Sequence, residues 1–253
     1  MNVLNQKNPV RLSDVTKYFE SGGNRTYALK NISLEVGRGE LILFLGPSGS
    51  GKTTLLTMMA GLIKPSKGSV FLFNRKVDTY SPKELQKLRA CSLGFIFQTF
   101  LLIDSLTVLE NLRVVLRFSG YPRKETNQKA IRLLQQFHIE ELAGKFPVCL
   151  SQGEKQRVAV ARAVANDASL ILADEPTGSL ESKQGFEVIS LLKKLSETED
   201  KSVVIASHDL RIVEFADRVF RLEDGSIRGN RPASFRPLKP YSASEHQIFA
   251  GNG

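Results

Sequence analysis

The chain has 253 residues and a mass of 28.1 kDa, enough for one large domain or two small ones, and 42 % of its residues are hydrophobic. These values exclude disordered and fibrous classes of protein. Lys and Arg outnumber Asp and Glu by 35 to 26, and the net charge of +9 favours phosphates, nucleic acid or anionic lipid as partners. No apolar run approaches the roughly 18 to 20 residues of a membrane span. The first ten residues lack the segments of a signal peptide, so we expect a cytoplasmic chain.

The two cysteines, Cys91 and Cys149, have no CxxC spacing and no neighbouring pair of histidines. This pattern argues against a disulfide scaffold and against a zinc site. We expect both to be ordinary buried thiols.

The first third of the chain is rich in strand patterns. They predict an antiparallel hairpin, a buried strand, a helix and a further strand, in that order: Val10–Phe19 with Tyr27–Val36, then Leu41–Leu45, Lys52–Leu62 and Gly68–Phe73. The run Leu41–Leu45 is apolar throughout, which is typical of a strand covered on both faces in a mostly parallel sheet. The last three elements form a predicted β-loop-α-β unit.

The middle of the chain has helical spacing, and alternating strands and helices return after Pro147. The predicted helices and strands are Pro82–Ala90, Thr107–Phe118, Lys124–Phe137, Ser151–Asn166, Ser169–Ala173, Ser182–Ser196 and Ser202–Ala206, followed by a hairpin around Glu223–Gly225. Thr107 and Glu110 have the spacing of a capping box. The alternation predicts an α/β layer interrupted by a helix-rich insertion.

We therefore expect one domain over residues 10–228, with a helical subdomain at about 99–165. Residues 1–9 form a short N-terminal extension. The tail 229–253 contains three of the ten prolines together with Ser, Gly and Asn, and we expect it to be flexible or ordered by a partner.

A glycine-rich segment between the buried strand and the following helix fits the P-loop pattern G-x-x-x-x-G-K-[ST]; its residues are Gly46, Pro47, Ser48, Gly49, Ser50, Gly51, Lys52 and Thr53. Glycines let several backbone N–H groups point into one concavity, and the helix N-terminus adds positive potential. The segment predicts a polyphosphate site. Lys52 would contact the β and γ phosphates, Thr53 would ligate Mg²⁺, and Thr54 would add a further contact at the helix start.

The apolar run Leu170–Ala173 ends in two adjacent acids, Asp174 and Glu175. At the carboxyl edge of a parallel sheet two carboxylates repel each other unless a cation or a proton lies between them. We expect Asp174 to act on the Mg²⁺ side. Glu175 would align and polarise the attacking water, and alignment should matter more than basicity because the ordinary Glu pKa is about 4.3.

The segment Leu150–Glu154, which lies shortly before this acidic strand, resembles the LSGGQ signature of ATP-binding cassette (ABC) proteins. Gln98 follows the apolar strand Gly94–Phe97 and looks like the Q-loop glutamine of that family. The resemblance extends over roughly Val10–Arg228. It implies an α/β P-loop NTPase fold with a mostly parallel core sheet, an antiparallel β edge and a helical subdomain.

Two further segments are similar to ABC motifs: Ser179–Glu181 looks like the D-loop, and His208 looks like the switch histidine. The resemblance implies a head-to-tail homodimer that holds two ATP molecules with Mg²⁺, each between the P-loop of one protomer and Ser151 and Gly153 of the other. It implies catalytic roles for Glu175, His208, Gln98 and Lys52, and metal ligation by Thr53, Gln98 and Asp174.

An aromatic residue near the N-terminus, Phe19, corresponds best to the family's adenine-stacking position, with Tyr18 as the one-residue alternative. Three residues depart from the family pattern: Gln152 and Glu154 in the signature, and Glu181 where the D-loop usually has Asp. We expect an added carboxylate near ATP to weaken nucleotide binding or to alter the rate, although Ser151 and Gly153 keep phosphate contact feasible.

The segment Phe95–Leu112 is unusually apolar for a loop region. In ABC transporters this region receives a cytoplasmic helix of the membrane subunit, so Phe100–Ile103 is a hypothetical permease socket; the alternative is that these residues close the core of the helical subdomain.

The amino-acid sequences of this segment and of residues 173–180 are similar to those of the LolD and MacB group, which drives lipoprotein release or efflux. The resemblance implies an ATPase subunit beneath separate permeases, peripheral at the cytoplasmic face of the inner membrane and its inner-leaflet surface, with no nucleic-acid partner. Import and a soluble, non-transport ABC ATPase are the alternatives.

Overall fold

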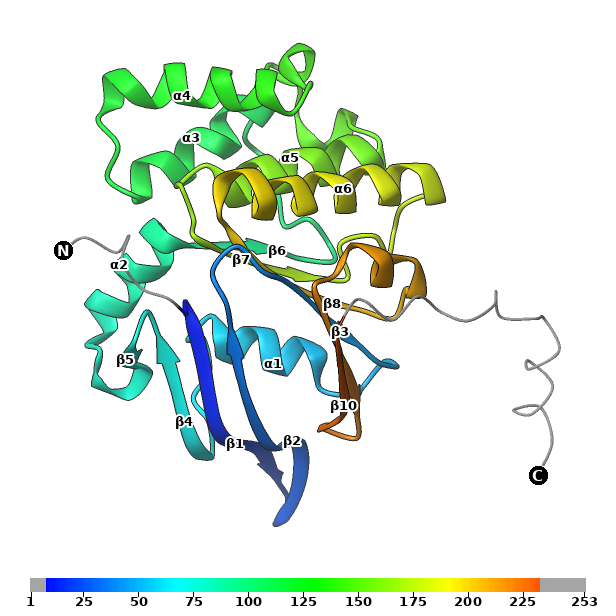
Figure 1. Cartoon of the computed structure of the whole chain (residues 1–253). Coiled ribbons are helices and arrows are strands. Elements are labelled where there is room, and N and C mark those ends of the chain that lie inside the picture. Colours follow the sequence, from blue (N-terminus) through cyan, green and yellow to red (C-terminus); the bar gives the residue numbers. More distant parts are fainter. Residues whose placement is uncertain (1–7, 233–253) are drawn as a thin grey trace, which may run out of the picture.

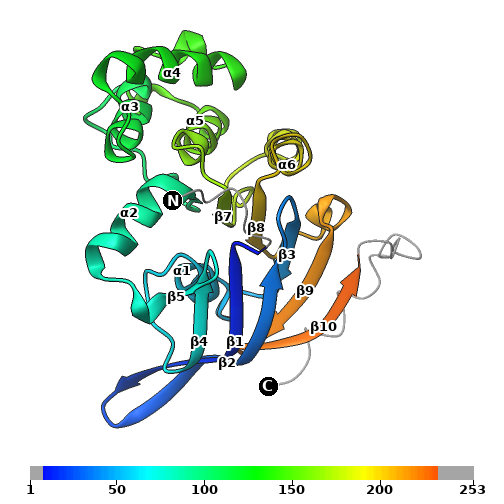
Figure 2. The ribbon, with the colours of Figure 1, turned by 60° about the vertical axis from the view of Figure 1, so that its left-hand side comes forward.

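The computed structural model describes residues 8–232, which form two β-sheets with a helix between them (Figures 1 and 2). The larger sheet has the order β10-β9-β3-β8-β7-β6, with β3 (Leu41–Leu45), β6 (Leu93–Ile96), β7 (Leu170–Asp174), β8 (Ser202–Ser207), β9 (Arg218–Glu223) and β10 (Ser226–Pro232). All neighbouring strands are parallel except β10, which pairs antiparallel with β9 at one edge. A mostly parallel core sheet with an antiparallel edge strand is therefore confirmed.

The smaller sheet is antiparallel and has the order β2-β1-β4-β5, with β1 (Val10–Ser21), β2 (Asn24–Val36), β4 (Lys67–Leu72) and β5 (Arg75–Lys76). The predicted hairpin is confirmed as β1 and β2. The strands before and after the P-loop helix, however, lie in different sheets and do not pair with each other. The burial pattern explains this difference, because β3 is buried at every position whereas β4 keeps exposed residues, as antiparallel strands commonly do.

Helix α1 (Lys52–Met59) lies between the two sheets. Leu55, Leu56, Met58 and Met59 are fully buried and belong to one apolar cluster that includes residues of β1, β3, β4 and β8. The helix ends earlier than the predicted Leu62, because Gly61 adopts a left-handed backbone with φ +63°. The four apolar side chains at the end of the helix thus fill the space between the two sheets.

The opposite face of the larger sheet is covered by α5 (Gln152–Val164) and α6 (Ser182–Glu199), with α3 (Val108–Phe118) and α4 (Arg123–Gln136) packed beyond them (Figures 1 and 2). Helix α2 (Pro82–Ser92) leads directly into β6, so the helix-rich middle of the chain is interrupted by a core strand. Short 3₁₀ turns occupy Val77–Thr79, Glu140–Leu142, Pro147–Cys149 and Leu210–Phe215. The capping box of Thr107 and Glu110 at the start of α3 is confirmed.

The two cysteines differ from the expectation of buried thiols. Cys149 is exposed in the 3₁₀ turn Pro147–Cys149, and Cys91 is half-buried near the end of α2. Local position explains this, because the turn projects Cys149 and its neighbour Val148 toward solvent.

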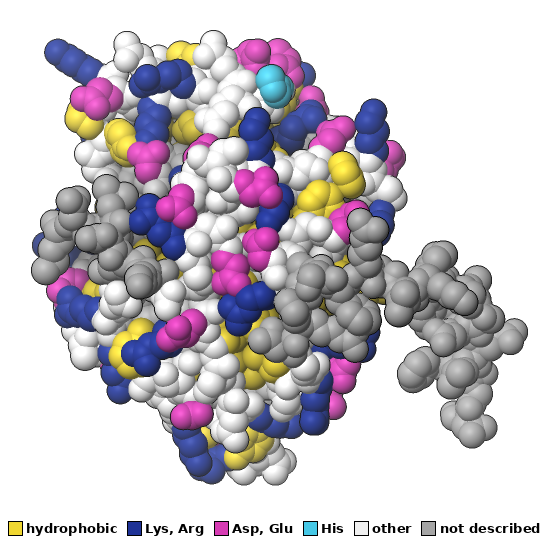
Figure 3. All heavy atoms as spheres, viewed as in Figure 1, with side chains coloured by type: hydrophobic (Ala, Val, Ile, Leu, Met, Phe, Trp, Pro, Cys, Tyr) yellow, Lys and Arg dark blue, Asp and Glu magenta, His cyan; other side chains and the backbone are white. Residues whose placement is uncertain are grey.

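Strand β10 continues to Pro232, beyond the Gly229 boundary expected for the tail 229–253. Residues 1–7 of the expected extension 1–9 and residues 233–253 of the tail lie outside the described residues. Among residues 8–232, no helix has the length and apolar character needed to cross a bilayer. On the face drawn in Figure 3, basic and acidic side chains are interspersed rather than separated into patches of one sign.

Candidate nucleotide-binding site

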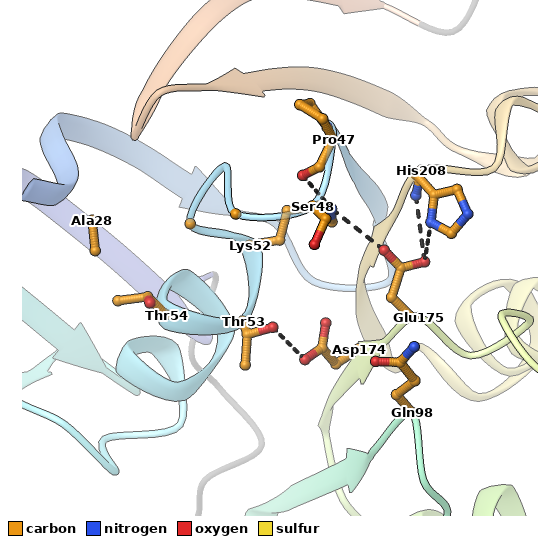
Figure 4. A pocket seen from close by; sticks show the side chains of 12 residues that line it. Ala28, Pro47, Ser48, Lys52, Thr53, Thr54, Gln98, Asp174, Glu175 and His208 are labelled. Atoms are coloured by element: carbon orange, nitrogen blue, oxygen red, sulfur yellow. Dashed lines mark hydrogen bonds and ion pairs between the residues drawn. The ribbon is translucent and has the colours of Figure 1, made fainter.

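A cavity of 490 Å³ opens where the carboxyl ends of β3, β7 and β8 meet the start of α1 (Figure 4). Its lining combines the P-loop, the two adjacent acids and the two residues that follow β6 and β8: Ala28, Pro47, Ser48, Gly49, Gly51, Lys52, Thr53, Thr54, Gln98, Asp174, Glu175 and His208. The carboxyl edge of a parallel sheet is where α/β proteins usually bind ligands. The structure therefore brings together four separate sequence motifs.

The P-loop is held in place by close backbone contacts that only glycine permits. A Cβ on Gly46 would lie 2.2 Å from the carbonyl oxygen of Leu222, and one on Gly51 would lie 2.3 Å from that of Ala28. Gly51 also has φ +102°, a conformation that other residues avoid. Strand β2 and the β9–β10 turn thus form a wall against which the loop is fixed.

Several features of the loop fit a polyphosphate. The N-terminus of α1 has no side-chain cap and no acidic residue in its first turn, so its N–H groups face the cavity without an internal counter-charge. The hydroxyl of Ser50 is buried and has no hydrogen-bond partner among the described residues. Gly49 adds open space where a Cβ would meet nothing within 4 Å.

Lys52 is the cation of the site. Its ammonium group donates hydrogen bonds to the carbonyl oxygens of Gly46 at 2.7 Å and Pro47 at 2.9 Å, and it lies 3.4 Å from Oε1 of Glu175. Only 7 % of Lys52 is exposed, so its charge acts in a poorly screened environment.

The hydroxyl of Thr53 on α1 donates a 2.7 Å hydrogen bond to Oδ2 of Asp174 at the end of β7. Burial raises the pKa of Asp174, and the nearby Glu175 raises it further, against the lowering effects of Thr53 and Lys52. A hydroxyl and a buried carboxylate are hard oxygen donors of the kind that Mg²⁺ prefers. The chemistry of this pair fits a divalent cation.

Glu175 follows directly and has a left-handed backbone with φ +47°. Its own N–H donates to the carbonyl of Ala206 at 2.8 Å, which ties it to β8. Oε2 accepts a hydrogen bond from the hydroxyl of Ser207 at 3.1 Å and lies 3.0 Å from Nδ1 of His208 (Figure 4). The carboxylate is therefore oriented by Ser207 and His208 at the end of the neighbouring strand β8.

Phe19 lies on β1, is 49 % exposed and does not line the cavity; the ammonium of Lys17 lies 5.1 Å from its ring centroid. The alternative, Tyr18, packs instead against Tyr27 at a centroid distance of 5.6 Å. Two residues of the site were not predicted from the sequence: Ala28, which lines the cavity, and Ser207, which contacts Glu175. No sequence motif includes Ala28. For Ser207, the sequence offered only its position before His208 at the end of a buried strand.

Ser151 and Gly153 stand at the start of α5 and do not line the cavity. Ser151 is the N-cap residue, and its hydroxyl accepts from the N–H of Glu154 at 3.3 Å while the Glu154 carboxylate accepts from the N–H of Ser151 at 2.7 Å. These bonds lower the pKa of Glu154. The carboxylate at the position of the family's glutamine is thus turned back onto its own helix.

Comparison with known proteins identifies the class. The sequence profile of the ABC transporter family matches residues 29–178, so the chain belongs to the ABC transporter family. It is 42 % identical over 222 residues to an ABC transporter ATP-binding protein, MJ0796, of Methanocaldococcus jannaschii, covering 86 % of this chain and 94 % of that protein. It is 42 % identical to a putative hemin import ATP-binding protein, HrtA, of Staphylococcus haemolyticus, and the match covers 86 % of this chain and 98 % of HrtA.

A longer relative is the macrolide export ATP-binding/permease protein MacB of Vibrio parahaemolyticus, at 38 % identity, where the match covers 86 % of this chain and 33 % of that protein. The solved structure of the MJ0796 dimer bound to ADP and Pi superimposes with a TM-score of 0.83 at 40 % identity, covering 88 % of this chain and 98 % of that one. The chain is therefore an ATP-binding, ATP-hydrolysing subunit of an ABC transporter, with the fold of cassettes that form dimers.

Proposed function

We propose that the cavity of Figure 4 is the ATP site and that its residues have the roles expected from their motifs. The proposal rests on one observation: two pairs of neighbouring residues, Lys52 with Thr53 and Asp174 with Glu175, meet in one cavity. The two pairs lie more than a hundred residues apart in the chain. Residues 46–51 and Thr54 would hold the phosphates through backbone N–H groups and hydroxyls. Lys52 would neutralise charge on the β and γ phosphates.

Mg²⁺ would be held by Thr53, Asp174 and Gln98, which lies beside Asp174 in the same cavity (Figure 4). When bound, the metal would offset phosphate charge. Glu175 would align water for attack on the γ-phosphate, and His208 would contact the same region from the end of β8. Phe19 on β1 would stack on adenine.

We propose that a second copy completes each site with Ser151 and Gly153. Both residues stand at the N-terminus of α5 away from their own cavity, Ser151 exposed and Gly153 buried, and the related MJ0796 cassette is dimeric. The test starts from Glu175→Gln, which should accumulate as an ATP-bound dimer in light scattering. Adding Ser151→Arg should abolish the dimer while leaving ATP binding by the monomer, and Asn127→Arg on α4 is the control; a dimer that persists would contradict the arrangement.

The exposed fractions of the side chains narrow the proposed permease socket to fewer residues than the sequence pattern does. Within Phe100–Ile103, Leu101 is 53 % and Ile103 43 % exposed, whereas Leu102 packs against the core. The guanidinium of Arg162 donates to the carbonyl oxygens of Phe100 and Leu101 and fixes the loop. Leu101 and Ile103 are thus the residues through which a permease helix would dock.

We further propose that the permeases are separate polypeptides and that the transporter exports its cargo or releases lipoproteins. The relatives of similar length are named ATP-binding proteins, whereas MacB is named an ATP-binding/permease protein and is matched over a third of its length. Import is the second candidate, because HrtA is named a putative hemin import protein. In either case the chain would work at the cytoplasmic face of the membrane.

The test of the catalytic proposal is Mg²⁺-dependent ATP hydrolysis by the purified chain beside Glu175→Gln and Thr53→Val. Both variants should lose hydrolysis, and Glu175→Gln should keep ATP binding. A Glu175→Gln variant that turns over at the wild-type rate would overturn the role of Glu175. Docking is tested by Leu101→Ser with Ile103→Ser, which should lose copurification of the permease from native membranes, while Phe118→Ser, exposed on α3, should retain it.

A further inference from the structure

Ser207 is the last residue of β8 and is completely buried. Its carbonyl oxygen accepts from the N–H of Gly46 at 3.2 Å, so its backbone adjoins the first residue of the P-loop. Its hydroxyl makes two hydrogen bonds: it donates to Oε2 of Glu175 at 3.1 Å and accepts from the N–H of Asp209, also at 3.1 Å. The side chain therefore stands at the junction of the P-loop, the acidic strand and the switch-histidine segment.

The geometry fixes the direction in which the Ser207 hydroxyl donates its proton. A serine hydroxyl has one proton, and because the Asp209 N–H occupies its acceptor side, that proton is directed at Glu175. Asp209 is itself fixed, since its carboxylate accepts hydrogen bonds from Nε and Nη2 of Arg211 at 2.7 to 3.1 Å. Arg211 also donates to the hydroxyl of Ser182 at 2.6 Å, which anchors this arrangement on α6.

The other two side chains that contact the Glu175 carboxylate are less dedicated to it, and the backbone N–H of His208 adds a longer bond of 3.4 Å to Oε2. Lys52 divides its charge between Glu175 and two P-loop carbonyls, and those two contacts are shorter. The His208 side chain is 67 % exposed. Under the proposed function both side chains turn to nucleotide phosphate. The Ser207 hydroxyl at 3.1 Å is then the shorter of the two bonds that still hold the carboxylate, the other being that of the His208 N–H at 3.4 Å.

We propose that Ser207 is a positioning residue for ATP hydrolysis, whose hydroxyl holds the Glu175 carboxylate in the orientation that aligns the attacking water. This inference rests on the proposed role of Glu175. A hydroxyl that donates to a carboxylate fixes the orientation of that group, and a misaligned reacting group loses rate rather than substrate affinity. The inference predicts a change in kcat and not in KM.

The experiment compares steady-state ATP hydrolysis and ATP binding for wild type, Ser207→Ala, Ser207→Thr and Glu175→Gln. Ser207→Ala should lose about tenfold in kcat, the worth of one charge-assisted hydrogen bond, with KM and ATP affinity within about twofold of wild type. Ser207→Thr keeps the hydroxyl and should restore most of the rate. Ser202→Ala is the matched control, because Ser202 is equally buried on β8 and donates to the carbonyl of Gly37 at 2.7 Å, remote from the cavity.

The outcomes separate the two claims. A wild-type kcat for Ser207→Ala, beside an inactive Glu175→Gln, overturns the role of Ser207 alone. A wild-type rate for Glu175→Gln overturns the proposed function of Glu175. Equal losses of kcat in Ser207→Ala and Ser202→Ala, or an effect on KM instead of kcat, would assign Ser207 a merely structural role. Thermal unfolding of each variant is measured beside the kinetics. If Ser207→Thr does not fold, Ser207→Cys replaces it.

Discussion

The hydroxyl of Thr53 and the carboxylate of Asp174 lie 2.7 Å apart, although the two residues are separated by 121 positions in the chain. One stands in the first turn of α1 and the other at the end of β7, so the bond closes the cavity between the P-loop and the acidic strand. It also identifies the two oxygen donors best placed for a divalent cation.

Asp174→Asn should abolish Mg²⁺-dependent hydrolysis yet raise the unfolding temperature at pH 8. Burial raises the pKa of Asp174, so the folded protein binds the proton more tightly than the unfolded chain and is destabilised once pH rises above the ordinary Asp pKa. Removing that charge should raise the unfolding temperature by about 2–4 °C, the shift expected for about 1 kcal/mol in a domain of this size.

The gain should shrink as pH falls toward the ordinary pKa of Asp, because both states then become protonated. Calorimetry in metal-free buffer from pH 4 to pH 8 measures this trend. The exposed Asp104→Asn is the control and should show no such gain. An Asp174→Asn advantage that grows at low pH would contradict the assigned cause.

Gly51→Ala should destabilise the protein far more than Gly49→Ala. Both positions have positive φ, which costs a non-glycine residue roughly 1–2 kcal/mol. Only the Gly51 Cβ would also collide with a backbone atom, the Ala28 oxygen at 2.3 Å, whereas a Cβ on Gly49 meets open space. Urea unfolding should therefore separate the two variants by about 2 kcal/mol. Equal midpoints would mean that β2 does not confine the loop.

Glu154→Gln should have little effect on ATP affinity, because the Glu154 carboxylate faces the N–H of Ser151 and not open space. Stability should respond instead. The pKa of Glu154 is lowered in the folded state, so the residue stabilises the fold above the ordinary Glu pKa and loses this effect as pH falls through the lowered value. At pH 7 the neutral variant should be less stable by about 0.5 kcal/mol.

The measurement for Glu154→Gln is urea unfolding at pH 7 and at pH 3, together with titration of ATP. The difference from wild type should be present at pH 7 and largely absent at pH 3. A marked gain in ATP affinity would instead support the sequence-based hypothesis that this carboxylate weakens nucleotide binding.

Arg162→Met should loosen the loop that contains Leu101 without lowering basal ATP hydrolysis. The Arg162 guanidinium holds the carbonyl oxygens of Phe100 and Leu101, both of which have left-handed backbones, and methionine cannot replace those bonds. Hydrogen exchange of the segment 99–106 should accelerate by about tenfold, as expected for losing a charged hydrogen bond. The exposed Arg132→Met serves as control, and unchanged exchange in Arg162→Met would contradict the anchoring role.

The sequence predicted a group of residues that the structure brings to one cavity, because each motif is local and chemically distinctive. The P-loop, Asp174 and Glu175, Gln98 and His208 each follow a buried strand, and parallel strands bring such residues to one edge. What could not be predicted was the pairing of strands across sheets. The segment Gly68–Phe73 was identified as a strand, but its membership of the smaller sheet depends on contacts with β1.

Side-chain orientation was the other limit. The resemblance to the signature predicted an added carboxylate near ATP, whereas in the structure the Glu154 carboxylate forms a capping box with Ser151. Ser207 could not be found at all from sequence, since a serine at the end of a strand becomes informative only when its hydroxyl partners are known.

The strand order has a consequence for synthesis of the chain. Strands β1, β2, β4 and β5 lie within the first 76 residues and can pair as they leave the ribosome, whereas β3 pairs with β8 and β9, which end at Ser207 and Glu223. Strand β3, which precedes the P-loop, therefore has no partner strand on either edge until most of the polypeptide has left the ribosome. Prematurely terminated products would carry the nucleotide motif without a folded site, and their free strand edges would make them substrates for chaperones and proteases.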